Sequence, residues 1–151
     1  MHKIRDWLYI GDYPSASLPD VIIKNKIQGM LQLYQPIKTK GVDTKFIGLQ
    51  DGIPIREEQL REGIEFIHQQ REKNHRILST CGAGVSRSVS FAIIALKEIE
   101  GMTLAQAYRN IYKLHAKAMP DHVHWKSIAD YYGENNNFWE LWSDITLDDI
   151  D

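Results

Sequence analysis

The segment from Cys81 to Ser88, near the middle of the chain, constrains the fold and the chemistry more than any other. It reads Cys-Gly-Ala-Gly-Val-Ser-Arg-Ser, follows a largely apolar stretch at 76–80 and precedes a run of helix formers at 89–100. This order predicts a buried strand, a glycine-containing loop and a helix. In such a unit the loop N–H groups and the positive end of the helix together bind an anion such as phosphate.

Three side chains of this segment suit phosphate chemistry. Cys81 is the only cysteine of the chain, and the positive field of the loop and helix favours its nucleophilic thiolate form. Arg87 offers a planar guanidinium that binds two phosphate oxygens at once. The Ser88 hydroxyl can donate to the sulfur, or cap the first turn of its own helix. The predicted phosphate-binding residues are Gly82, Ala83, Gly84, Val85, Ser86 and Arg87, with Ser86 mainly a structural donor.

Cysteine, any five residues, arginine, then serine or threonine is the signature of the cysteine-dependent protein phosphatases. The chain resembles their dual-specificity branch over roughly residues 7–132, including a first strand at Trp7–Gly11 and an acidic loop at Asp51. The resemblance implies hydrolysis of phosphate monoesters through a phosphocysteine intermediate, with Cys81 and Arg87 as catalytic residues. The implied substrates are phosphotyrosine and phosphoserine or phosphothreonine in proteins. No metal and no organic cofactor is implied.

Asp51 is the candidate general acid. The resemblance places that acid on a loop about thirty residues before the cysteine, and Asp51 lies thirty positions before Cys81. Asp51 directly follows a predicted strand, Lys45–Leu49, and active sites of open α/β sheets gather at the carboxyl ends of strands. An Asp before a Gly is also a common turn pair. Glu57 and Glu58 are the alternatives, although both fit the first turn of a helix.

Two positions depart from the family pattern. Thr80 stands where the residue before the cysteine is usually His, so thiolate stabilisation would rest on the loop, the helix end and Arg87. Asp121 stands where the family commonly carries an Asn that braces the signature loop. Because a carboxylate would repel phosphate, we expect Asp121 to face backbone amides or to cap the last major helix.

Strands and helices alternate along the chain, which predicts an α/β fold: one domain over 1–151, with a central, mainly parallel sheet of about four to five strands and helices on both faces. The resemblance makes it a protein tyrosine phosphatase-like fold of the dual-specificity type. The tail, 134–151, is predicted to be a C-terminal extension with a short docked helix and a frayed end. Strands are predicted at 8–10, 29–34, 45–49 and 76–80, and helices at 19–24, 57–73, 89–100, 103–117 and 120–132.

Composition excludes several other classes. The net charge of −2 gives no electrostatic footprint for nucleic acid or an anionic membrane. The N-terminus lacks the apolar core of a signal peptide, and the longest apolar run, 91–96, is too short for a membrane span. A single cysteine fits the reducing cytoplasm, so we expect a cytoplasmic monomer that acts on phosphorylated proteins. His122 and His124 fall on opposite sides of a helix, so no metal site is predicted.

Four alternatives remain at this stage. Cys81 could be a small buried hydrophobe beside an ordinary turn, but that leaves the positions of Arg87 and Ser88 unexplained. A phosphate-binding module without turnover usually loses the nucleophile or the acid, whereas Cys81 and Asp51 are both present. The same fold could act on a phosphoinositide, a phosphoglucan or an RNA 5′-phosphate; lipid and RNA versions tend to carry lysines in or beside the loop, which 82–85 lacks. Sulfur transfer also uses a cysteine loop, but an Arg-Ser pair heading a helix favours phosphate.

Overall fold

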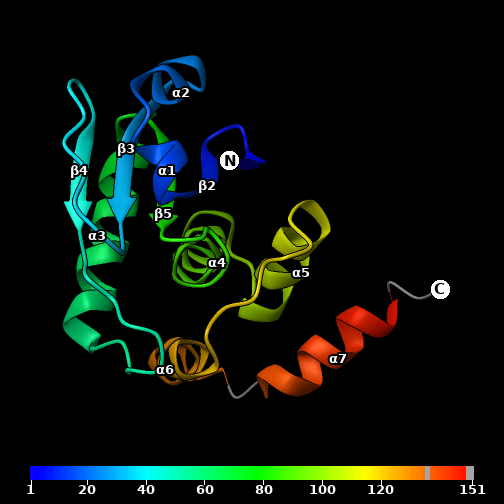
Figure 1. Cartoon of the computed structure of the whole chain (residues 1–151). Coiled ribbons are helices and arrows are strands. Elements are labelled where there is room, and N and C mark those ends of the chain that lie inside the picture. The colour runs from blue at the N-terminus through cyan, green and yellow to red at the C-terminus, as the bar shows by residue number, and fades with distance from the viewer. Residues whose placement is uncertain (135–136, 149–151) are drawn as a thin grey trace.

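The structure, a computed structural model, describes residues 1–134 and 137–148. These residues form a five-stranded sheet and a set of helices around it (Figure 1). The strands are β1 (His2–Arg5), β2 (Leu8–Asp12), β3 (Ile27–Gln32), β4 (Asp43–Phe46) and β5 (Arg76–Cys81). The helices are α1 (Tyr13–Ala16), α2 (Pro19–Lys24), α3 (Glu57–Glu72), α4 (Arg87–Glu100), α5 (Leu104–Leu114), α6 (His122–Tyr132) and α7 (Phe138–Asp148).

The sheet has the order β1-β2-β5-β3-β4, and every neighbouring pair except β1–β2 is parallel. The predicted α/β fold with a mainly parallel sheet is therefore confirmed. β5 lies in the centre, and all of its residues after Arg76 are buried, as expected for a strand covered on both faces. Because β5 ends at Cys81, the sheet places the thiol at its central carboxyl edge.

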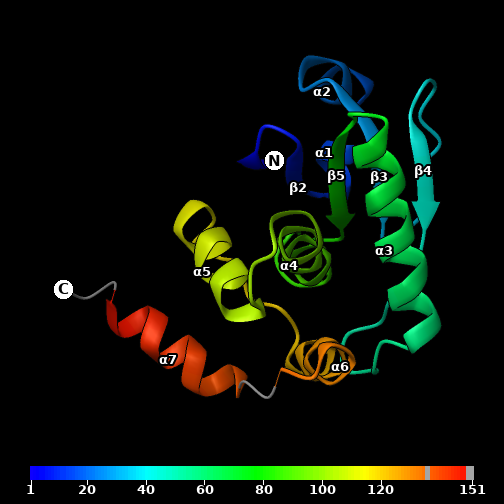
Figure 2. The ribbon, with the colours of Figure 1, turned by 180° about the vertical axis from the view of Figure 1, so that it is seen from behind.

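Helices cover both faces of the sheet, but unequally. The larger core packs α3 and α4 against one face and continues into α5, α6 and α7. A smaller core, containing Tyr9, Met30 and Leu78, lies on the other face under α1 and α2. Figures 1 and 2 show α3 on the opposite side of the sheet from these two short helices. The alternation of β3, with Met30 in one core and Leu31 in the other, follows the two-residue period of a strand.

α4 is the central helix, seen end-on in the middle of Figure 1. Its residues from Ser88 to Leu96 are all buried, as its almost wholly apolar sequence predicts. α3 approaches it closely at Gly63, where an added Cβ would lie 2.1 Å from a ring carbon of Phe91. Gly101 ends the helix in the left-handed conformation, with φ +71°. The segment from Cys81 to Ser88 thus leads directly into a helix that is buried in the core.

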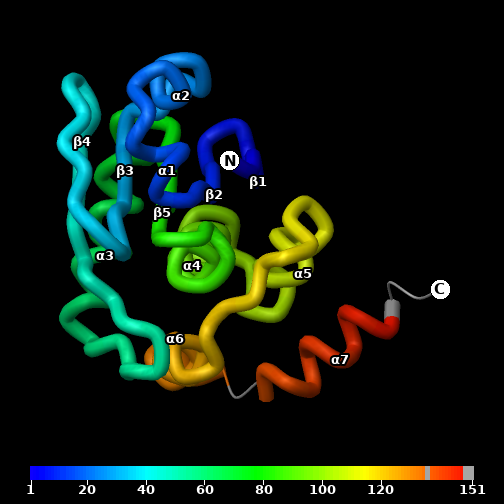
Figure 3. The backbone as a smooth tube through the Cα atoms, in the orientation of Figure 1, coloured from blue at the N-terminus to red at the C-terminus, as the bar shows by residue number. Residues whose placement is uncertain are grey.

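Several local predictions need correction. The strand expected at 45–49 is β4, which ends at Phe46, although Ile47 and Leu49 still donate backbone hydrogen bonds to the end of β3 and the residue after it. β1 was not predicted because its polar sequence shows no alternation; it pairs with β2 at the edge of the sheet (Figure 3). α1 was missed because four residues carry no helical period. The helix expected from 120 begins at His122.

The tail helix α7 packs on the main core through three apolar side chains, Phe138, Leu141 and Ile145. They follow a helical spacing, and each is at most 7% exposed. This agrees with the short docked helix predicted for the tail. The frayed end predicted beyond it falls on 149–151, outside the described residues. Within the described ranges, no helix combines the length and apolar character that a bilayer span requires.

Candidate active site

Cys81 lies at the carboxyl end of β5, 3% exposed, with the loop 82–86 folded beyond it. Its Sγ is 3.1 Å from Oγ of Ser88, which is fully buried in the first turn of α4. The Ser79 hydroxyl donates to the Ser88 carbonyl oxygen at 2.9 Å and so ties β5 to the start of α4. The two predicted site residues, thiol and hydroxyl, are therefore in direct contact.

The loop between them is braced through its carbonyl groups. The Tyr13 N–H donates to the Gly82 carbonyl oxygen at 3.1 Å, and the Met119 N–H donates to that of Val85 at 2.9 Å. Nε2 of the buried His115 lies 2.8 Å from the Gly84 carbonyl oxygen and donates to it. None of these bonds uses a loop N–H. These bonds fix the loop through its carbonyl groups and do not engage its N–H groups, which an anion-binding loop needs for its ligand.

Gly84 and Ser86 fix the shape of the loop. Gly84 has φ +71°, and a Cβ there would lie 3.0 Å from the backbone of Gly11, so both the conformation and the close approach require glycine. The Ser86 hydroxyl accepts from the Asp121 N–H at 3.0 Å. The Ser86 side chain thus binds the chain segment before α6, but in this bond it is an acceptor and not the structural donor that the sequence predicted.

Arg87 is held by three groups from other parts of the chain. Its Nη1 donates to the Leu49 carbonyl oxygen at 2.9 Å, and its guanidinium lies 5.1 Å from the ring centroid of Tyr34. Its Nε is 3.8 Å from a carboxylate oxygen of Asp51. The side chain of Arg87 is only 16% exposed, whereas that of Asp51 is 60% exposed. The structure thus places Arg87, the predicted phosphate-binding arginine, beside Asp51, the predicted general acid. Both lie at the carboxyl edge of the sheet, where β5 ends at Cys81.

Asp51 occupies a tight turn. The Ile53 N–H donates to the Gln50 carbonyl oxygen at 3.2 Å, and Gly52 has φ +78°, which is the left-handed conformation that a type II turn needs at its third residue. Asp51 is five positions beyond Phe46 at the end of β4, not directly after the strand as predicted. The alternatives Glu57 and Glu58 lie exposed in the first turn of α3, paired with arginines.

Three polar side chains of α6 and its cap bind the backbone around this turn, which we call the acid loop (residues 50–55). Nε2 of His124 donates to the Gln50 carbonyl oxygen at 2.9 Å. The Gly52 N–H donates to a carboxylate oxygen of Asp121 at 2.9 Å, and the Ile55 N–H donates to the Ser127 hydroxyl at 3.0 Å. Asp121, His124 and Ser127 follow one another at three-residue spacing, so they share one face of the helix. These hydrogen bonds fix the backbone on both sides of Asp51.

Asp121 also caps α6, because its other carboxylate oxygen accepts from the N–H groups of Val123 and His124. It therefore faces backbone amides and caps the helix, as expected from the sequence. Burial alone would raise the pKa of Asp121, but hydrogen bonds from the His124, Gly52 and Val123 N–H groups, together with the charge of His124, outweigh it and leave the pKa lowered.

Thr80, just before the nucleophile, is 3% exposed, and its hydroxyl has no hydrogen-bond partner among the described residues. Its neighbour Ser79 is equally buried, but its hydroxyl is bonded to Ser88. Among the described residues, the Thr80 hydroxyl thus makes no hydrogen bond to the loop or to the sulfur in place of the histidine that is usual there.

The sequence did not identify three residues that contact the site from other parts of the chain: Tyr34, His115 and His124. Tyr34 follows β3 at the carboxyl edge of the sheet. Because active sites of open α/β sheets gather at this edge, the position of Tyr34 after a predicted strand could have indicated it. Its ring meets the Tyr13 ring edge-on, with centroids 5.6 Å apart. Nothing in the local sequence of His115 indicates its contact with Gly84. His124 could have been found from its helical spacing with Asp121 and a polar Ser three residues on.

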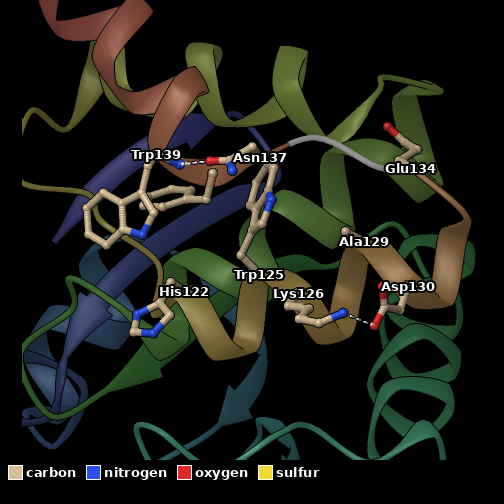
Figure 4. Close-up of a pocket in the computed structure, with 9 residues that line it drawn as sticks. His122, Trp125, Lys126, Ala129, Asp130, Glu134, Asn137 and Trp139 are labelled. Carbon is tan, nitrogen blue, oxygen red and sulfur yellow. Dashed lines mark hydrogen bonds and ion pairs between the residues drawn. The ribbon is translucent and has the colours of Figure 1, made fainter.

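A hollow of about 370 Å³ lies between α6 and the start of α7 (Figure 4). Trp125, His122 and Trp139 line it, and none of its lining residues belongs to the signature loop or the acid loop. Among the described residues, no group of three or more His, Cys, Asp or Glu side chains is placed to hold a metal ion.

A family model described as "Dual specificity phosphatase, catalytic domain" matches residues 8–134. Dual specificity protein phosphatase 22 of Homo sapiens is 31% identical over 96 residues, which cover 62% of this chain and 52% of that protein. Dual specificity protein phosphatase 15 of Mus musculus is 26% identical over 106 residues, which cover 68% of this chain and 45% of that protein. The chain thus spans about half the length of these relatives.

Solved structures give the same picture at the level of the fold. The crystal structure of DUSP15 superposes with a TM-score of 0.79 at 22% identity and covers 97% of this chain and 94% of that one. The crystal structure of human DUSP28 gives a TM-score of 0.78 at 16% identity, over 87% of this chain and 94% of that one. These likenesses show a shared fold.

Proposed function

The chain belongs to the dual specificity phosphatase family, a family of cysteine-dependent phosphatases, and we propose that it hydrolyses phosphate monoesters through a phosphocysteine formed on Cys81. The observation that carries this proposal is the contact between Cys81 Sγ and Ser88 Oγ, 3.1 Å apart beneath a loop whose carbonyl groups are bound outward. A nucleophile with a neighbouring hydroxyl, under loop N–H groups, is the arrangement that a phosphoenzyme mechanism needs.

In the first step the substrate phosphate binds to the N–H groups of 82–87 and to the Arg87 guanidinium. The Cys81 thiolate attacks the phosphorus, so a P–S bond forms and the P–O ester bond breaks. The leaving oxygen takes the proton of Asp51, which acts as general acid. The nearby Arg87 donors stabilise the charge on the phosphoryl oxygens as it spreads in the transition state.

In the second step Asp51, now a carboxylate, accepts a proton from a water molecule that attacks the phosphorus. A new P–O bond forms, the P–S bond breaks and inorganic phosphate leaves. Cys81 departs as a thiolate, which the Ser88 hydroxyl stabilises by donating a hydrogen bond to the sulfur. The cycle restores the starting protonation of both residues, and none of its steps calls for a metal ion or an organic cofactor.

The substrates we propose are phosphotyrosine and phosphoserine or phosphothreonine side chains of proteins. The exposed Tyr34 ring, beside Gly82 and over Arg87, offers a flat apolar surface to a substrate next to the bound phosphate. A single catalytic thiol persists in a reducing compartment, which supports a cytoplasmic location. We propose that the protein acts as a monomer.

The test is hydrolysis of phosphopeptides by the wild type and by Cys81→Ser. The proposal expects turnover of phosphotyrosine and phosphothreonine peptides that Cys81→Ser abolishes, with vanadate still bound. Phosphoinositides, phosphoglucans and RNA 5′-phosphates belong in the same panel. Faster turnover of one of them would overturn the proposal that the substrates are phosphorylated proteins. Phosphate binding without any turnover in the wild type would overturn the enzymatic assignment.

A further inference from the structure

A cavity of about 660 Å³ lies at the edge of the sheet opposite to the active site, beside α2, which is at the top of Figure 1. It is bounded by the starts of β3 and β5 and by residues 38–42. Arg76 opens β5 at this cavity, and Cys81 ends the same strand, so a strand length of about 16 Å separates the two sites. The volume is that of an ordinary small-molecule site.

The cavity has an apolar floor that belongs to the smaller core. Ile22 and Ile27 are buried members of that core, and Val42 packs against it. Two short helices, α1 and α2, of four and six residues, lie on this face of the sheet, and Met1, Ile37 and Val42 pack beside them. Ile23 stands at the rim with 72% of its surface exposed. An apolar chain in the cavity would remove this surface from water, which is favourable.

The rim of the cavity is cationic. Lys26, Lys38, Lys40 and Arg76 line it, and no lining residue is acidic. Within the part of the chain that the structure describes, the amino groups of the three lysines make no hydrogen bond and no ion pair, while Arg76 donates to Tyr9 Oη at 3.2 Å. The whole chain carries a net charge of −2, so this is a local excess of positive charge. An anion among these groups would relieve their mutual repulsion.

Lys26 reaches the rim from a strained backbone. It follows the last turn of α2 with φ +56°, a conformation that is unfavourable for residues other than Gly or Asn. At the corresponding place after α3 the chain has Asn74, with φ +57°, which tolerates this conformation. Lysine is the less stable choice for this turn, and strain of this kind is found where a side chain has a function.

We propose that this cavity binds a single-chain amphiphile with a carboxylate head, of the fatty-acid type. The chain lies on Ile22, Ile27 and Val42, and the carboxylate lies among the rim cations Lys26, Lys38 and Lys40. The apolar floor distinguishes this ligand from a simple anion, and the cationic rim distinguishes it from a neutral hydrocarbon. The site is separate from Cys81, so the proposal does not depend on the phosphatase activity.

The first experiment titrates the full chain with decanoate, below the concentration at which it forms micelles, and follows the backbone amides by NMR. We expect saturable shifts at Ile23, Gln28 and Gly41, with the amides of 82–87 unchanged. Decanol and inorganic phosphate are the matched probes. Equal binding of decanol, equal shifts with phosphate at the same concentration, or no shifts with decanoate would each overturn the proposal.

The second experiment uses variants. Lys38→Gln combined with Lys40→Gln should weaken decanoate binding roughly tenfold, as expected for the loss of two exposed charge pairs. Lys113→Gln with Lys117→Gln makes the same change in net charge outside the cavity and should leave binding unchanged. Lys26→Gly should raise the midpoint of thermal unfolding, because glycine removes the strain, and yet weaken binding. Unchanged affinity in Lys26→Gly and in the double variant would refute the site, and the dispersion of the backbone amide spectrum checks that each variant is folded.

Discussion

Nε2 of His124 lies 2.9 Å from the carbonyl oxygen of Gln50, the residue directly before Asp51. A carbonyl oxygen only accepts, so Nε2 carries the hydrogen of this bond. His124 is fully buried, and its Nδ1 has no hydrogen-bond partner among the described residues. The ring therefore joins the helix α6 to the acid loop through this one bond. If Asp51 is the general acid, His124 is a residue that positions it.

Replacement of His124 tests this positioning. His124→Phe keeps an aromatic ring but removes the donor, so phenyl phosphate should be hydrolysed roughly tenfold more slowly, which is a part of the about 10²–10⁴-fold that a general acid contributes. A highly activated aryl phosphate, whose leaving group needs no proton, should be hydrolysed almost normally. The measurement is kcat/KM across a series of aryl phosphates with leaving groups of different basicity.

Two controls separate positioning from a general loss of structure. His122→Phe, two residues earlier on the same helix, should leave both rates unchanged. In an Asp51→Asn background the His124 substitution should have no further effect, because the group through which it acts is gone. Equal losses for all leaving groups would contradict the positioning role.

Ser88→Ala tests the second half of the cycle. A hydrogen bond to a charged group contributes about 1.5–3 kcal/mol, so its loss should slow breakdown of the phosphocysteine about 10–100-fold. Formation of the phosphocysteine should be less affected, so an aryl phosphate should give a burst of phenol followed by slow turnover. Ser90→Ala, a buried serine of the same helix whose hydroxyl bonds to the Ser86 carbonyl oxygen, is the control without a burst. A Ser88→Ala enzyme without a burst would show that its hydroxyl does not assist the leaving sulfur.

Removal of the Thr80 hydroxyl and removal of the Ser79 hydroxyl should change the free energy of unfolding in opposite directions. The Thr80 hydroxyl is buried without a partner, so Thr80→Val should raise the free energy of unfolding by roughly 1 kcal/mol. The Ser79 hydroxyl donates to Ser88, so Ser79→Ala should lower the free energy of unfolding by a similar amount, about 1 kcal/mol. Urea unfolding of both variants measures this. Destabilisation by Thr80→Val would mean that its hydroxyl makes a favourable contact.

Asp121 gives the fold a dependence on pH. Its lowered pKa means that the carboxylate stabilises the folded state above its ordinary pKa of 3.8, and that this contribution is lost as the pH falls below that value through the lower folded pKa. Asp121→Asn replaces the oxygen that accepts from Gly52, so it should cost roughly 1 kcal/mol at neutral pH. The difference from the wild type should shrink in acid.

Unfolding by urea at a series of pH values measures this difference. Asp130→Asn is the control, because Asp130 forms an exposed pair with Lys126 on the same helix and such pairs contribute little. A wild-type advantage over Asp121→Asn that stays constant from neutral pH into acid would contradict the assignment.

The parts of the site that are local in sequence could be predicted, and those that join distant segments could not. The strand, loop and helix around Cys81 are adjacent in the chain, so residue types and spacing indicate them directly. The contact of His124 with Gln50 spans 74 positions. It depends on how α6 packs, which a single sequence does not report. Asp121 was a partial success, because its cap is local but its bond to Gly52 is not.

Errors in the predicted elements have similar causes. β1 is a polar edge strand whose sequence does not alternate. It forms a strand because its backbone pairs with that of β2. β4 ends at Phe46, although Ile47 and Leu49 are buried and still donate backbone hydrogen bonds to Gln32 and Leu33. Tertiary packing decides both cases, since the same residues could extend a strand or line a buried loop.

The central claim is that phosphate passes through a covalent bond to Cys81. The most direct measurement mixes the enzyme rapidly with an aryl phosphate, quenches in acid and records the intact mass. The account predicts a wild-type species heavier by one phosphoryl group, mapped to the peptide that contains Cys81, and no such species in Cys81→Ser. Turnover by the wild type with no phosphorylated enzyme at any time, or the same adduct in Cys81→Ser, would contradict it.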